Sequence, residues 1–208
     1  KPLKQVIKNR AFGTLIGRYN GKNAANEYIV RNNIKDGSYV FIDYSHRYTK
    51  PFMPKISDKE YDLVISFLTP HYFAAEKAKG KKKIAWIHTD PLEMHFDPQE
   101  CQKVYRDFDQ IFCVSKAIKQ KFDQLVPEYA GKTKVFYNRF SEKRILSKAT
   151  EYTPFSEEDT YRVVTVGRVD NASKRMDGIV RVCAKLKNDG ISQFQWHIVG
   201  NGPDMPGN

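Results

Sequence analysis

Six short runs of β-branched and aromatic residues recur along this chain, and amphipathic stretches separate them. Each run is nearly all apolar, as expected for a strand that is covered on both faces of a parallel sheet. Strands that alternate with helices in this way predict βαβ units and an α/β fold with a mostly parallel sheet. The predicted strands are residues 63–67, 84–87, 111–114, 135–137, 163–166 and 196–199.

Two of the intervening stretches have apolar residues at helical spacing. The first is 115–126, with Ser115 as its expected N-cap, and the second is 176–188, which Gly190 is expected to terminate. The pattern is weaker before residue 60. There we predict a helix at 24–33, a strand at 39–42 and an irregular segment at 48–54.

A polar segment interrupts the alternation between residues 140 and 159. It is longer than most connections inside one domain, so we predict an interdomain linker at 141–158. The linker separates an amino-terminal domain at 1–140 from a carboxyl-terminal domain at 159–208. The second domain is predicted to be incomplete, because one helix, one strand and the turn at 200–203 cannot cover both faces of a sheet.

The composition excludes several classes of protein. The three cysteines, Cys101, Cys113 and Cys183, lack CxxC spacing, which argues against a zinc site or a disulfide scaffold and indicates a reducing compartment, the cytoplasm. No apolar run approaches the ~20 residues of a membrane span. The net charge of +11 predicts attraction to polyanions, and nucleic acid, anionic lipid and nucleotide phosphates all qualify.

The segment 163–175 (VVTVGRVDNASKR) is the strongest candidate for a binding site. An apolar strand that ends in Gly167 and is followed by Arg168 and Lys174 is typical of a sheet edge that holds an anionic ligand. A nucleotide diphosphate is the expected ligand. The alternative is a solvated basic loop.

Six segments in order resemble the motifs of glycosyltransferase family 4, the retaining, nucleotide-sugar-dependent enzymes with GT-B architecture. The segments are 61–67 (YDLVISF), 83–90 (KIAWIHTD), 108–115 (FDQIFCVS), 134–138 (KVFYN), 166–175 (VGRVDNASKR) and 198–203 (IVGNGP). The resemblance implies two Rossmann-like domains with mostly parallel sheets. Both are expected to be incomplete, because the family's glycine-rich loop would precede residue 1 and its pair of glutamates would follow residue 208. Arg139 follows Asn138 where many relatives have glycine.

The same resemblance assigns roles to particular residues. Arg168 and Lys174 would bind the donor diphosphate, so no metal and no cofactor is expected. His88 would lie in the cleft near the donor, donating a hydrogen bond or assisting proton movement.

Five further residues are secondary candidates. Gly167, Gly200 and Gly202 belong to turns that either bring N–H groups near an anion or are purely structural. Asp90 either orients His88 or caps the residues after it. Ser115 lies at a similar strand-to-helix corner, where an N-cap explains it without a substrate.

The expected activity is transfer of a sugar, with retention, from a nucleotide-diphosphate sugar to a saccharide or lipid-linked acceptor in cell-surface polysaccharide biosynthesis. Such an enzyme would be cytoplasmic, with contact to the inner face of the membrane, and this chain alone would be inactive. The lysines within 77–83 are either a solvated surface or a membrane-facing patch.

Two other functions remain open. A noncatalytic nucleotide or sugar binder would share the sheet and the basic loop. A nucleic-acid-binding domain would explain the charge, but the sequence has no RNP-like motif, GXXG loop or zinc knuckle, so no nucleic acid partner is expected. No role and no metal is assigned to the remaining histidines, which are His46, His71, His95 and His197.

Overall fold

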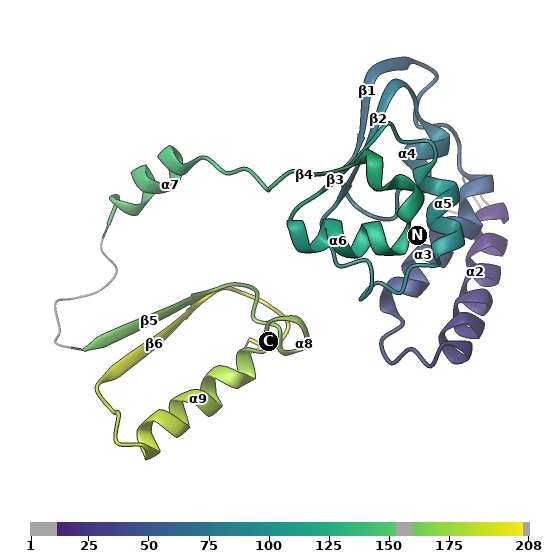
Figure 1. The fold of residues 1–208 in the computed structure, drawn as a ribbon. Helices are drawn as coiled ribbons and strands as arrows, with labels where there is room; N and C mark the ends of the chain where they lie inside the picture. Colours follow the sequence, from purple (N-terminus) through teal and green to yellow (C-terminus); the bar gives the residue numbers. More distant parts are fainter. Residues whose placement is uncertain (1–11, 153–159, 206–208) are drawn as a thin grey trace. The chain divides into compact units, whose positions relative to one another are not determined.

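The computed structural model describes residues 12–152 and 160–205. The chain divides into two compact units, Lys1–Phe140 and Ser141–Asn208. Strands and helices alternate in both (Figure 1), which confirms the predicted α/β class. Among the described residues, no helix is both long and apolar enough to cross a membrane.

The first unit contains a four-stranded sheet in which all neighbouring strands are parallel. The spatial order is that of the chain, β1-β2-β3-β4, as in a Rossmann-like βαβ arrangement. The strands are β1 (Glu60–Ser66), β2 (Lys79–Ile87), β3 (Gln110–Cys113) and β4 (Thr133–Val135). Strand β4 begins and ends two residues before the strand predicted at 135–137. Beyond Val135, the Phe136 N–H still donates to Cys113 O at 2.9 Å.

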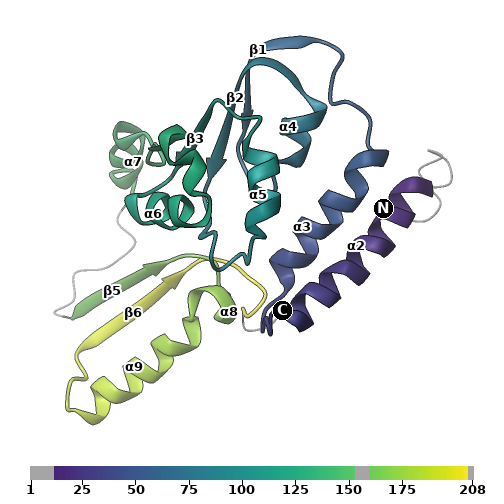
Figure 2. The same ribbon diagram turned by 45° about the vertical axis from the view of Figure 1, so that its right-hand side comes forward.

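Three helices cover one face of this sheet (Figure 2): α4 (Tyr72–Lys77), α5 (Pro98–Tyr105) and α6 (Lys116–Leu125). A short 3₁₀ helix, η2 (Pro127–Lys132), follows α6. Ala85, Ile87 and Ile111 of the sheet are fully buried beneath Phe108 and Phe122. Each large apolar side chain buried here stabilises the fold by roughly 1.5–3 kcal/mol, so this contact is the principal core of the unit.

The opposite face of the sheet is aromatic. The ring of Trp86 lies 5.1 Å from that of Phe67 and 5.0 Å from that of Phe136. On the edge strand, Leu63 and Ile65 are about half exposed, at 47% and 49%. Both faces of the sheet are therefore apolar, but the prediction that every strand is covered on both faces was wrong for this edge strand.

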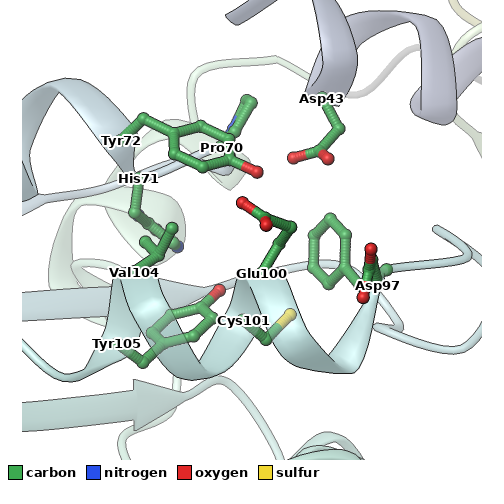
Figure 3. Close-up of a pocket in the computed structure, with 10 residues that line it drawn as sticks. Asp43, Pro70, His71, Tyr72, Asp97, Glu100, Cys101, Val104 and Tyr105 are labelled. Carbon is green, nitrogen blue, oxygen red and sulfur yellow. The ribbon is translucent and has the colours of Figure 1, made fainter. Parts of the chain in front are cut away.

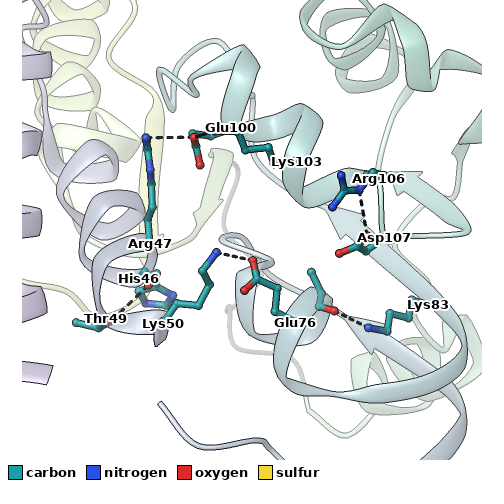
Figure 4. Close-up of polar contacts among 11 residues, drawn as sticks. His46, Arg47, Thr49, Lys50, Glu76, Lys83, Glu100, Lys103, Arg106 and Asp107 are labelled. Carbon is teal, nitrogen blue, oxygen red and sulfur yellow. Dashed lines mark hydrogen bonds and ion pairs between the residues drawn. The ribbon is translucent and has the colours of Figure 1, made fainter. Parts of the chain in front are cut away.

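Lysines occupy the first half of β2, because this strand begins at Lys79 rather than at residue 84. Lys81 Nζ lies 2.7 Å from Asp62 Oδ1, and Lys82 Nζ lies 3.1 Å from Asp109 Oδ1. Lys83 Nζ donates to Ala75 O at 2.5 Å (Figure 4). These contacts fit the solvated-surface alternative for the lysine tract.

Helices α2 (Phe12–Arg31) and α3 (Ser38–Thr49) form an antiparallel pair (Figure 2), and a 3₁₀ turn, η1 (Lys50–Phe52), follows them. Helix α2 has a small residue at every fourth position from Gly13 to Ala25. A Cβ atom at Gly17 would lie 2.5 Å from Tyr48 O, and one at Gly21 would lie 2.8 Å from Tyr44 O. The glycines therefore let the two backbones touch.

The predicted strand at 39–42 was wrong, because these residues lie inside α3. Val40 and Tyr44, four residues apart, are buried, whereas Phe41 and Ile42 are exposed. The burial has the helical period, and packing against α2 outweighs the β propensity of this aromatic and β-branched run.

The second unit has two parallel strands, β5 (Tyr161–Val166) and β6 (Phe194–Val199), connected by α8 (Asn171–Lys174) and α9 (Met176–Asn188). Gly190 terminates α9 as predicted: it has φ 84°, and the Ile191 N–H donates to Leu186 O at 2.9 Å. The segment expected as a linker contains a further helix, α7 (Glu142–Ala149), with Ser141 as its N-cap. The predicted boundary at 158–159 lies in residues outside the described range.

Replacing Gly17 by alanine should destabilise the α2–α3 pair by about 2 kcal/mol, since the new Cβ would force the backbones apart. The gain in helix propensity, about 1 kcal/mol, is smaller than this cost. Gly178→Ala in α9 is the matched control, because nothing lies within 4 Å of its added Cβ. Hydrogen exchange should show faster opening of α2 and α3 in the first variant and slower opening of α9 in the second. Equal effects of the two substitutions on hydrogen exchange would contradict the close approach of α2 and α3.

Candidate functional site

Two loops lie side by side at the carboxyl ends of β5 and β6, and main-chain hydrogen bonds join them. The Gly167 N–H donates to Val199 O at 3.0 Å, and the Val169 N–H donates to Asn201 O at 3.1 Å. The Asp204 N–H returns a hydrogen bond to Val169 O at 3.2 Å. The loop that carries Arg168 is therefore held in register by the turn after β6.

Glycine is required in this turn because the two backbones are in contact. A Cβ atom at Gly200 would lie 1.8 Å from Gly167 O, and one at Gly202 would lie 2.1 Å from Val169 O. The Gly202 N–H itself donates to Asn201 Oδ1 at 2.7 Å. These distances give both glycines a structural role, which was one of the two alternatives for the turn.

The two ends of the basic loop meet. A Cβ atom at Gly167 would lie 3.4 Å from Met176 Cε, and Met176 is buried. Arg168 comes one residue after the first end, and Lys174 comes two residues before the second. The fold thus brings these two candidate residues, six positions apart in sequence, onto one closed loop.

The loop carries three cations, and the two candidates among them, Arg168 and Lys174, are exposed, while Arg175 Nε lies 3.8 Å from Asp177 Oδ1. Arg168 Nη1 lies 3.9 Å from Asp170 Oδ2, and the arginine side chain is 67% exposed. No residue within 12–152 or 160–205 forms an ion pair with Lys174, the last residue of α8. An exposed ion pair contributes only about 0–1 kcal/mol, so an incoming anion would displace Asp170 from Arg168 at small cost.

Three residues that the sequence did not single out hold the loop in its conformation: Asp170, Ser173 and Asp204. Asp170 caps α8 by accepting from the N–H groups of Ala172 and Ser173, and the Ser173 hydroxyl lowers the pKa of this carboxyl. Asp204 Oδ2 accepts from the Asn171 N–H at 2.6 Å. Asp170 could have been found from its N-cap pattern, but the Asp204 contact spans 33 residues and leaves no local signal.

His88 of the first unit directly follows β2, at the carboxyl edge of its sheet. Its ring lies 4.3 Å from the Phe67 ring and 5.5 Å from the Trp86 ring. Burial lowers its pKa below the usual 6.5, so the imidazole is neutral at neutral pH. Its Nε2 is buried and has no hydrogen-bond partner among the described residues, an unmet hydrogen-bonding capacity that calls for an explanation.

Asp90 and Ser115 both make capping contacts. Asp90 Oδ1 accepts from the Leu92 N–H at 3.0 Å, and Oδ2 accepts from Lys121 Nζ. Burial raises the pKa of Asp90, but these donors lower it by more, so the net shift is downward. Ser115 caps α6 by accepting from the Ile118 N–H at 3.2 Å. Since both oxygens of Asp90 have other partners, the capping alternative describes this residue.

A cavity of about 20 Å³, enough for one water molecule, lies between α3, α4 and α5 (Figure 3). Asp43, His71, Tyr72, Glu100 and Cys101 are among its lining residues. Burial raises the pKa of Asp43 to about 6, although the Tyr72 hydroxyl donates to this carboxyl and lowers it. This network was not predicted, because its members come from three separate helices.

Asp43 should make stability fall as pH rises. Its folded pKa of about 6 exceeds the ordinary 3.8, so the folded state binds the proton more tightly. Its stabilising contribution is complete below pH 4 and is lost through pH 6, by up to about 3 kcal/mol. Asp43→Asn lacks this titration. Relative to the wild type, the variant should therefore gain stability from pH 4 to pH 7 in chemical denaturation.

The stability of Asp43→Asn should be compared with that of the wild type at each pH, because the titration of His71 changes stability in the opposite direction. Burial lowers the pKa of His71 to about 3, which makes the wild type less stable as pH falls below 6.5. This histidine is present in both proteins and cancels in the comparison. A difference that does not change with pH would contradict the assignment to Asp43.

Over the described parts of the chain, no group of three histidine, cysteine or acidic residues is placed to hold a metal ion. The chain matches no protein-family model and no curated protein. What the structure establishes is an α/β fold with a parallel four-stranded sheet and a second, two-stranded parallel unit.

Proposed function

We propose that this chain binds the diphosphate of a nucleotide sugar through Arg168 and Lys174. In the proposed enzyme, the sugar passes with retention to a saccharide or lipid-linked acceptor. The observation that carries the proposal is the loop after β5, joined by main-chain hydrogen bonds to the turn after β6, with Arg168 and Lys174 exposed on it. A loop at the carboxyl end of parallel strands is where α/β proteins bind ligands.

The chemistry of the leaving group explains the two cations. A diphosphate gathers negative charge as the glycosidic bond breaks, so fixed positive charges stabilise the transition state more than the ground state. Arginine supplies a planar pair of donors, and lysine supplies a compact charge. With these two charges in place, the proposed reaction needs no metal ion and no cofactor.

His88 is proposed to act on the sugar side of the reaction. Its neutral imidazole can donate or accept one hydrogen bond through the unpartnered Nε2. The rings of Phe67 and Trp86 fix its orientation and exclude water from one side. These properties suit a residue that orients a sugar hydroxyl.

The proposed architecture is GT-B, with the acceptor bound by the first unit and the donor by the second. By the motif resemblance, the proposed setting is the cytoplasm, at the inner face of the membrane, in the synthesis of a cell-surface polysaccharide. The three segments 83–90, 166–175 and 198–203 support this proposal by their order and by their positions at strand ends.

The test uses UDP, GDP and ADP as probes, followed by the corresponding nucleotide sugars. At least one diphosphate should bind, and binding should weaken in Arg168→Ala. His88→Ala should impair sugar transfer but leave diphosphate affinity largely unchanged, with His88→Gln retaining part of the activity through its amide. A large loss of nucleotide affinity in His88→Ala would make His88 a donor ligand instead. If none of the three diphosphates binds, the proposed function is wrong.

A further inference from the structure

Three tyrosines of the α2–α3 pair form a continuous ladder that the proposed mechanism does not use. The Tyr28 ring lies 5.6 Å from the Tyr44 ring, and Tyr44 is stacked on Tyr48 at 6.2 Å. Tyr44 is buried at the centre, whereas Tyr28 and Tyr48 are only partly buried at its two ends. The ladder therefore has a covered middle and two accessible ends.

Two hollows lie along this ladder, and they share Arg47 and Tyr48. One, of about 290 Å³, also contacts Glu27, Tyr28 and Arg31. The other, of about 310 Å³, also contacts Asn20 and Phe52. Each is at the lower end of the size range of small-molecule sites, about 300–1,000 Å³. Because they share two residues, we treat them as one groove, the α2–α3 groove.

Arg47 is a partly buried polar residue of this groove, with its side chain 25% exposed, and one of its N–H groups lacks an acceptor among the described residues. Its Nη2 lies 3.2 Å from Glu100 Oε1 (Figure 4), and its guanidinium carbon lies 4.9 Å from the centre of the Tyr44 ring. Its Nη1 is buried and donates to no described acceptor, since the carboxylate of Asp97 is 3.9 Å away. A buried N–H group without an acceptor indicates that a water or a ligand belongs beside it.

Charge and ring geometry narrow the chemistry of the ligand. Glu100 and Asp97 already neutralise Arg47, so the groove has no surplus positive charge there to attract a phosphate. A cationic ligand is also disfavoured, because the guanidinium of Arg31 lies over Tyr28 as that of Arg47 lies over Tyr44. The ligand that still fits the groove is a neutral molecule with an apolar face and several hydroxyl groups.

We propose that the α2–α3 groove binds a neutral saccharide ring. The C–H face of the sugar packs on the partly exposed ring of Tyr48, which Tyr44 and Tyr28 support through the ladder. Its hydroxyls bond to Arg47, Glu27 and Asn20, which line the groove. This inference rests on the proposed function for one detail only, namely that the bound saccharide is the acceptor of the transfer reaction.

The test measures binding of the methyl glycosides of glucose, galactose, mannose and N-acetylglucosamine to the full chain by saturation-transfer NMR. At least one should bind at millimolar concentration. Tyr48→Leu and Tyr28→Leu, which keep apolar volume but remove a ring, should each weaken binding about tenfold. Tyr19→Leu is the matched control on α2, because Tyr19 is 69% exposed and lies outside the groove. It should leave binding unchanged.

Each result has a distinct meaning. Circular dichroism of the leucine variants must match that of the wild type, and Arg47→Lys, which keeps the charge but not the planar N–H groups, provides a second variant with an expected loss. Binding of no glycoside, or equal binding by wild type and both groove variants, overturns the inference. Diphosphate binding in the same samples reports on Arg168 and Lys174, so a failure of the groove and a failure of the proposed function are told apart.

Discussion

Turnover of the proposed enzyme should fall by about 10²-fold or more when Arg168 or Lys174 is replaced by alanine, the effect expected from losing one preorganised charge partner of the transition state. The loop keeps its shape in both variants, because main-chain bonds and the Asp170 cap, rather than these side chains, hold it. The decrease should therefore appear in the rate of sugar transfer without loss of folding. Transfer from a nucleotide sugar in the active enzyme is the measurement.

Arg181→Ala is the control for this experiment. Arg181 is another exposed arginine of the same unit, at 67%, and it pairs with Asp177 on α9 rather than belonging to the loop. Its removal should change turnover by less than about twofold, as for most surface substitutions. Unchanged turnover in both Arg168→Ala and Lys174→Ala would refute the assignment of these two residues.

Gly200→Ala should disrupt the second unit, with an expected destabilisation of about 3 kcal/mol or more. The added Cβ would lie 1.8 Å from the carbonyl oxygen of Gly167, and neither backbone can rotate away as a side chain can. The two loops would have to separate, and the hydrogen bonds between them would break. Hydrogen exchange of β5 and β6 and the affinity for diphosphate should both report the loss.

Gly167→Ala is the matched control for Gly200→Ala, because Gly167 lies on the other side of the same backbone contact. Its Cβ would meet only Met176 Cε, at 3.4 Å, which is an ordinary van der Waals distance to a flexible side chain. This variant should retain protection of both strands and bind diphosphate nearly as well as the wild type. Similar damage from both substitutions would mean that the two loops do not touch as described.

The sequence predicted the sheet better than the helices before it. Strands β2, β3, β5 and β6 contain all or most of the predicted apolar runs, although β5 is not covered on both faces, since Val164 and Val166 are 47% and 77% exposed. Helix α2 was predicted only from residue 24, because Gly13, Gly17 and Gly21 have low helix propensity. Their spacing of four was the available signal, since glycines one turn apart line one side of a helix and let a second helix approach closely.

The candidate site was predictable in part. Arg168 and Lys174 stand out because they follow a strand and a glycine in sequence, so local reasoning reaches them. Asp204, which holds the same loop, could not be found in this way, because its partner Asn171 is 33 residues away and depends on the pairing of β5 with β6. The surroundings of His88 also escaped prediction, since Phe67 belongs to the segment that follows the neighbouring strand β1.

The joint between the loops after β5 and β6 also bears on redesign. It is made largely of main-chain hydrogen bonds, and its geometry depends on side chains mainly at Gly200, Gly202, Asp170 and Asp204. Exposed positions on the loop, such as Ala172, can therefore be varied in a mutant library while Arg168 and Lys174 stay in place. Ligand preference and loop architecture are encoded by different atoms, so one can be engineered without rebuilding the other.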